Sequence, residues 1–89
     1  MSVANQIEQK LTSLLHPVAL EVEDESHKHK GHAGAREGGE THFRVTITAE
    51  AFRGQSRVAC HRLVTNALGE LIGNPIHALS ITARAPDQP

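Results

Sequence analysis

The sequence predicts a small α+β domain in which two helices cover one face of a three-stranded sheet. Apolar residues recur at helical spacing near the N-terminus and again in the second half, and three other segments alternate between apolar and polar residues. The predicted order is therefore helix, strand, strand, helix, strand. With 89 residues the chain is expected to form a single domain over residues 1–89.

The first helix is expected over residues 2–15, with Ser2 as its N-cap and Pro17 beyond its end. Its buried face should consist of the apolar residues at steps of three and four, namely Val3, Ile7, Leu11, Leu14 and Leu15. A strand with one wet face should follow. Its inward side chains should be Val18, Leu20 and Val22.

A polar, glycine-rich segment over residues 25–41 then separates this strand from the next one. Such a segment cannot bury itself, so we expect a surface loop. The second strand starts at His42 and should pair antiparallel with the first. Its inward side chains should be Phe43, Val45 and Ile47.

The second helix should begin after an N-cap at Ser56 and end at Gly73, with Pro75 blocking its extension. Its apolar face should comprise Cys60, Leu63, Val64, Ala67, Leu68 and Leu71. The last strand, residues 76–84, should run parallel to the strand it joins, because a helix crosses between them. On it, His77 should face the same side as Leu79, Ile81 and Ala83. Residues 85–89 are expected to form a flexible tail.

Composition narrows the classes of function. The net charge of −1 and pI near 6.6 argue against strong nonspecific binding to nucleic acid. The single cysteine makes no internal disulfide and favours a reducing compartment, so we expect a cytoplasmic protein. No apolar run approaches the roughly 18 residues of a membrane span. The sequence contains no phosphate-binding glycine motif and no nucleophile–base–acid set, so an enzyme is not expected.

The histidines are the candidates for metal chemistry. His77, near the start of the last strand, is either a half-buried histidine bonded to the backbone or a metal ligand at the rim of the sheet. His27, His29 and His32 are either solvated loop residues or metal ligands. The chain has no Cys-x-x-Cys pair, so a self-contained zinc or thiolate cluster site is not expected. Any cluster bound here must take ligands from another molecule.

Two further features lie on the second helix. Cys60 falls on the apolar stripe and is interpreted as a small buried hydrophobe. Arg57, His61 and Arg62 are placed on the outer face of the helix. They form either a phosphate-contacting patch or an ordinary solvated surface.

Five segments in this order together resemble the BolA family. They are DESHKHKGH at 24–32, ETHFRV at 40–45, FRGQS at 52–56, HRLV at 61–64 and IHALSI at 76–81. The resemblance extends from Ile7 to Ala85. It implies an α-β-β-α-β fold related to class II KH domains, which agrees with the order of elements given above.

The resemblance also implies a partnership with a monothiol glutaredoxin. The two proteins would share a [2Fe–2S] cluster in iron–sulfur assembly, trafficking or iron signalling. His77 of the IHALS motif would be one ligand. The second would be a loop histidine, His32 or the less favoured His29, because the loop has no cysteine. The glutaredoxin would contribute its own cysteine and a glutathione thiolate, so the isolated chain is expected to bind no cluster. The second helix and last strand would form the docking face.

Other BolA-like proteins resemble transcriptional regulators that bind DNA through the second helix. At that place the chain has Cys60-His61-Arg62 where relatives usually have Arg-His-Arg, and Thr65 where many have tyrosine. One cation is therefore missing. DNA binding through Arg57, His61 and Arg62 is the alternative function, and the sequence leaves open whether the chain forms a homodimer.

Overall fold

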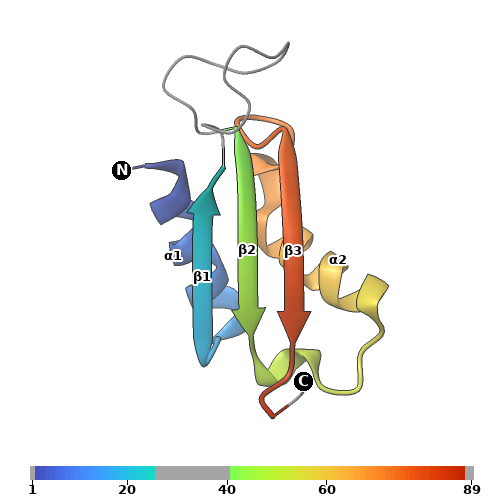
Figure 1. Cartoon of the computed structure of the whole chain (residues 1–89). Coiled ribbons are helices and arrows are strands. Elements are labelled where there is room, and N and C mark those ends of the chain that lie inside the picture. The colour runs from blue at the N-terminus through green and yellow to red at the C-terminus, as the bar shows by residue number, and fades with distance from the viewer. Residues whose placement is uncertain (1, 26–40, 88–89) are drawn as a thin grey trace.

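The computed structural model describes residues 2–25 and 41–87. The elements in chain order are α1 (Val3–Leu15), β1 (Ala19–Asp24), β2 (His42–Thr48), the 3-10 turn η2 (Glu50–Phe52), α2 (Arg57–Leu68), the 3-10 turn η3 (Gly69–Leu71) and β3 (Ala78–Arg84) (Figure 1). Most of the predicted histidine loop, residues 26–40, lies outside the described residues. The predicted order of helices and strands is confirmed.

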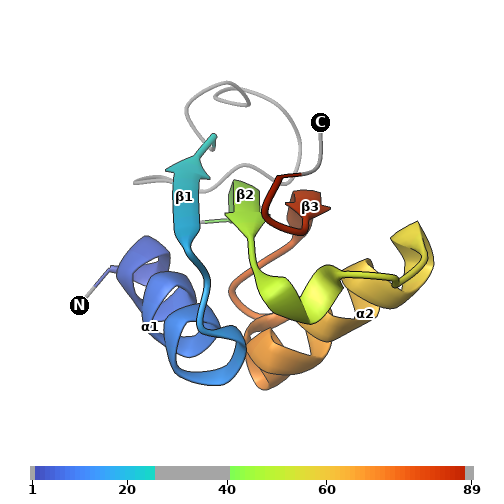
Figure 2. The same ribbon diagram turned by 90° about the horizontal axis from the view of Figure 1, so that it is seen from below.

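The sheet has the strand order β1-β2-β3, so β2 is central and the other two strands are edges. β1 pairs with β2 antiparallel, and β3 pairs with β2 parallel, in a register that runs from His42 opposite Ala78 to Thr48 opposite Arg84. Both helices lie on the same face of the sheet (Figure 2). The predicted fold class and both predicted strand directions are therefore confirmed.

The core lies between the two helices and the sheet. Its fully buried apolar side chains come from α1, β2, η2 and α2, and they include Ile7, Leu11, Val45, Ile47, Phe52, Val64 and Leu68. Ser2 and Ser56 cap the two helices, since their side chains accept hydrogen bonds from the N–H groups of Asn5 and Ala59. These bonds satisfy backbone donors that a helix start otherwise leaves free. In the described part of the chain no helix is long and apolar enough to cross a membrane.

Two apolar residues expected in the core are exposed. Leu14 is 60% exposed because the stripe that packs on the sheet continues from Leu11 to Leu15, and Leu14 lies about 100° around the helix from Leu15. Val18 is 70% exposed because it precedes β1, which begins at Ala19. The predictions for these two residues are wrong.

The second helix ends earlier than predicted. Gly69, at φ 55°, follows the last helical residue, and its N–H donates to the carbonyl of Thr65. The apolar pattern runs past this point because Leu71 reaches the core from η3. Gly73 instead lies in the next turn, where its N–H donates to the carbonyl of Ile76.

The predicted tail is ordered over its first residues. Ala85 is fully buried, and the carbonyl of Pro86 accepts a hydrogen bond from Nη2 of Arg53 at 3.1 Å. This segment therefore packs against the turn around η2. Residues 88 and 89 lie outside the part that the structure describes.

Candidate functional site

His77 precedes β3 in the connection from η3, and its side chain is exposed. Its backbone N–H donates to the carbonyl oxygen of Thr41 at 2.8 Å, and the N–H of Ala78 donates to the same oxygen at 3.2 Å. The prediction that His77 lies within the last strand is therefore wrong, because β3 begins one residue later, and the alternative of a half-buried histidine is wrong because the side chain is exposed. The imidazole of His77 is exposed to solvent, whereas the backbone of His77 is held by the hydrogen bond to Thr41.

The same end of the sheet holds both ends of the segment that contains the loop histidines (Figure 1). Glu25 and Thr41 are the last described residues on either side of it. The N–H of Glu25 donates to the carbonyl of His42 at 2.7 Å, which joins the two ends. His77 thus lies beside the point where this segment leaves and rejoins the sheet. His29 and His32 themselves lie outside the described residues.

Thr41 and His42 support this end of the sheet, a role that the sequence pattern did not predict for either residue. Thr41 is fully buried, and a hydrogen bond of 2.7 Å joins its Oγ1 to Nδ1 of the half-buried His42. On the other side of the segment, Glu25 pairs with Arg44 at 3.1 Å. The one feature of the sequence that could have indicated this supporting role is the position of the polar residue Thr41 directly before an alternating strand.

The described residues contain an incomplete set of metal ligands. Within residues 2–25 and 41–87, no group of three or more His, Cys, Asp or Glu side chains could hold a metal ion. His77 offers one exposed imidazole, which is a ligand that iron–sulfur clusters accept in place of thiolate. This donor fits a cluster only if its other ligands come from outside the described residues.

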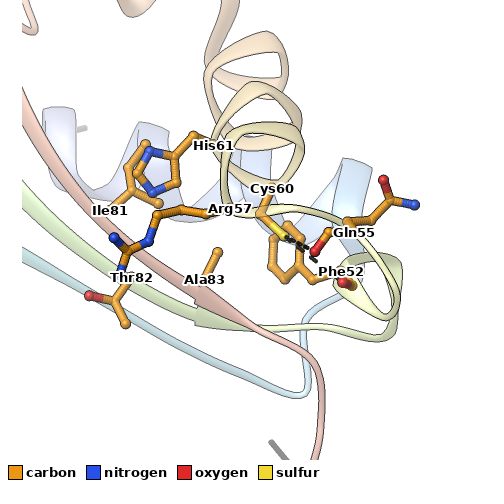
Figure 3. Close-up of a pocket in the computed structure, with 8 residues that line it drawn as sticks. All are labelled: Phe52, Gln55, Arg57, Cys60, His61, Ile81, Thr82 and Ala83. Atoms are coloured by element: carbon orange, nitrogen blue, oxygen red, sulfur yellow. Dashed lines mark hydrogen bonds between the residues drawn. The ribbon is translucent and has the colours of Figure 1, made fainter.

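The prediction that Arg57 and His61 lie on the outer face of α2 is wrong. They are one helical turn apart and point into a groove of about 490 Å³ between α2 and β3 (Figure 3). Arg62 is not among the residues that line this groove. Arg62 therefore does not share this groove with Arg57 and His61.

Cys60 lies at the floor of the groove. Its side chain is 5% exposed, and Sγ is 3.9 Å from the carbonyl oxygens of Phe52 and Gln55. The interpretation of Cys60 as a small buried hydrophobe is confirmed.

Together these features define a compact α+β domain with an exposed imidazole at one end of its sheet. A family model described as BolA-like protein matches residues 11–88. The chain belongs to the BolA-like protein family, which confirms the resemblance noted in the sequence.

Individual relatives agree with this assignment. BolA-like protein 1 of Homo sapiens is 48% identical over 92% of this chain and 57% of the relative. SufE-like protein 1, chloroplastic/mitochondrial, of Arabidopsis thaliana is 46% identical over 91% of this chain but only 23% of the relative. The chain therefore spans only part of these two proteins. The solved structure of BolA1 from Arabidopsis thaliana superposes with a TM-score of 0.85 at 37% identity, covering 100% of this chain and 99% of that one.

Proposed function

We propose that this BolA-like protein is the partner of a monothiol glutaredoxin and shares a [2Fe–2S] cluster with it, in iron–sulfur assembly, trafficking or iron signalling. The observation that supports this most is the exposed His77 beside the two ends of the histidine segment. A single exposed imidazole at this end of the sheet can serve as a cluster ligand if a second molecule supplies the remaining ligands.

The proposed ligands from this chain are His77 and either His32 or His29. The glutaredoxin would provide its own cysteine and the thiolate of glutathione. Replacing thiolates by neutral imidazoles reduces the negative charge around a cluster and raises its reduction potential. On this proposal the isolated chain holds no cluster.

The backbone around His77 supports its role as a ligand. Its N–H is bonded to Thr41, a fully buried residue, so its Cα is fixed to the sheet. The exposed imidazole can therefore be presented without a rearrangement of the fold. Ligands held on rigid elements lose less conformational entropy on binding than ligands on free loops. We propose that α2 and β3 form the docking face for the glutaredoxin.

The test is an anaerobic titration of cluster-loaded monothiol glutaredoxin with this protein, followed by visible circular dichroism. We expect new circular dichroism bands that saturate at equimolar protein, because the ligands and surroundings of the cluster change when histidines of this chain bind it. The spectrum of glutaredoxin alone, unchanged across the titration, would rule out the shared cluster.

DNA binding is not favoured by the geometry of the basic residues. Arg57 and His61 point into the groove beside β3, and Arg62 does not line it. Binding to duplex DNA would need to weaken with salt at a slope of about −0.9 per phosphate contact. A titration of labelled duplex at several salt concentrations measures that slope.

We also propose that the protein acts without catalysing a reaction of its own, and that it acts in the cytoplasm. The cytoplasmic proposal rests on the single buried cysteine. The name of the Arabidopsis SufE-like relative places that protein in chloroplasts and mitochondria. Cell fractionation with antibodies to this chain distinguishes the compartments.

A further inference from the structure

The groove between the start of α2 and the edge strand β3 combines polar and apolar linings. Arg57, His61 and Thr82 contribute polar atoms, and Phe52 and Ile81 contribute apolar surface (Figure 3). Ile81 lies about 13 Å along the strand direction from His77, at about 3.3 Å per residue. The groove is thus separate from the candidate metal ligand.

The strand that forms one wall has an open edge. The N–H of Ala78 and the carbonyl of Arg84 are both bonded on the β2 side, to Thr41 and Ala49. Because backbone groups alternate along a parallel strand, the N–H and C=O groups of Ile81 and Ala83 point to the opposite side. β3 has no further strand beyond it in the described part of the chain. An added strand could use these backbone groups.

The groove also has a basic lining. No carboxylate of residues 2–25 or 41–87 forms an ion pair with Arg57 or His61. None of the residues that line the groove is acidic, and Arg57 brings a positive charge to it. The groove is therefore locally basic, although the whole chain has a net charge of −1.

We propose that this groove binds an extended, acidic segment of a partner protein, which adds to β3 as a fourth strand. The backbone of the segment would bond to Ile81 and Ala83, and a carboxylate side chain would reach Arg57 and His61. Strand addition of this kind takes its affinity from backbone hydrogen bonds and its specificity from side-chain pockets. Arginine suits the role because its planar fork pairs with a carboxylate through two hydrogen bonds.

A second copy of this chain is a poorer occupant. In a two-fold dimer that paired β3 with β3, the same groove of both copies would meet at one interface. Arg57 would then lie at the same interface as its own equivalent, which is unfavourable because like charges repel. Charge complementarity therefore selects an acidic partner. The groove lies on the α2–β3 face that is proposed above as the docking face, but the inference needs only the groove and stands whether or not His77 binds iron.

The probe is a fluorescein-labelled hexapeptide of alternating valine and threonine with one central glutamate, and binding is followed by fluorescence anisotropy. We expect Arg57→Ala to weaken binding about tenfold, because a hydrogen-bonded charge pair is lost. The matched control is Arg62→Ala, which is on the same helix but outside the groove and should bind like the wild type.

Two changes to the peptide test the same idea on the unaltered protein. Replacing its glutamate by glutamine should weaken binding about as much as Arg57→Ala. Two N-methylated peptides are compared, one methylated at the odd-numbered amides and the other at the even-numbered amides. Only one edge of the peptide faces β3, so one methylation pattern should abolish binding and the other should leave it unchanged. Equal affinities for the glutamate and glutamine peptides, or for the two methylated peptides, would overturn the proposal. So would sedimentation data showing a dimer that the peptide does not dissociate.

Discussion

The carbonyl oxygen of Thr41 accepts the backbone N–H of His77 at 2.8 Å, which ties the end of the histidine segment to the start of β3. These two residues are 36 positions apart in the sequence, yet one hydrogen bond fixes their relative position. The exposed imidazole and the chain ends that flank the other histidines are therefore held at one place.

The first prediction concerns Thr41→Val. The substitution keeps the backbone carbonyl that accepts from His77 but removes the hydroxyl that bonds to Nδ1 of His42. We expect a loss of about 1 kcal/mol in the free energy of unfolding, the usual value of one such hydrogen bond. Urea denaturation measures it. Thr46→Val, on the same strand, is the control and should cost less; an equal cost would show that the hydroxyl of Thr41 has no special role.

The second prediction compares two valines on α2. Val64 is fully buried in the core, whereas Val58 is 59% exposed. Val64→Ala should lower the free energy of unfolding by about 2 kcal/mol, because it removes two buried carbons and leaves a cavity. Val58→Ala should change it by less than about 0.5 kcal/mol. Similar losses in chemical denaturation would mean that α2 packs on the sheet through a different face.

The third prediction concerns the end of α1. His16 has left-handed backbone angles, φ 48° and ψ 55°, where a β-carbon is strained. Glycine adopts this conformation freely, so His16→Gly should raise the stability by about 0.5–1 kcal/mol. Ser13→Gly, inside the same helix, should lower it by a similar amount. Thermal unfolding of both variants tests the prediction, and destabilisation by His16→Gly would contradict it.

The fourth prediction is a pH dependence at the turn before α2. The hydrogen bond from Arg53 lowers the pKa of the Glu50 carboxyl below its ordinary 4.5, with a smaller contribution from the charge of Arg53. Because the folded pKa is lowered, the stabilisation is present above the unfolded pKa and is lost as the pH falls through the folded pKa.

Both side chains of the ion pair are exposed, so the effect should be small. Urea unfolding between about pH 3 and 7 should show Glu50→Gln less stable than wild type above pH 4.5, with the two converging in acid. Glu70→Gln, which changes an exposed carboxyl outside this ion pair, serves as the control and should follow the wild-type curve. Parallel curves for wild type and Glu50→Gln at all pH values would contradict the prediction.

Most of the fold could be predicted from the sequence because each element carries its own periodicity. The alternation of Phe43, Val45 and Ile47 and the helical spacing of Cys60, Val64 and Leu68 are local patterns, and both describe buried faces. The parallel direction of β3 followed from the helix that crosses before it. Local patterns were therefore enough for the order and direction of the elements.

The ends of elements were less predictable because tertiary contacts decide them. The apolar pattern of α2 continues to Leu71, but Gly69, at a positive φ, ends the helix and a 3-10 turn carries Leu71 into the core. Ala85 looked like part of a tail, and it is fully buried. No local signal distinguishes these cases from an ordinary helix end or a free terminus.

The candidate site was predictable only in part. His77 was a candidate from its place at the start of the last strand and again from the family motif, but its exposure and its bond to Thr41 depend on the pairing of β2 with β3. The basic groove could not be predicted, since it needs the first turn of α2 to lie against the edge strand. On the sequence alone, Arg57 and His61 were indistinguishable from residues of a solvated helix face.

The central claim is that the imidazole of His77 binds a cluster shared with a monothiol glutaredoxin, and the variant that tests it is His77→Ala. The side chain is exposed and the bond to Thr41 uses the backbone, so the stability should change by less than about 0.5 kcal/mol. A loss of function in this variant would therefore not reflect unfolding.

The decisive measurement is the visible circular dichroism of cluster-loaded glutaredoxin titrated anaerobically with His77→Ala, with wild type, and with His16→Ala as the exposed-histidine control. We predict that the bands of the complex are lost or shifted with His77→Ala and retained with His16→Ala. Identical spectra for all three proteins would contradict the claim that His77 is a ligand.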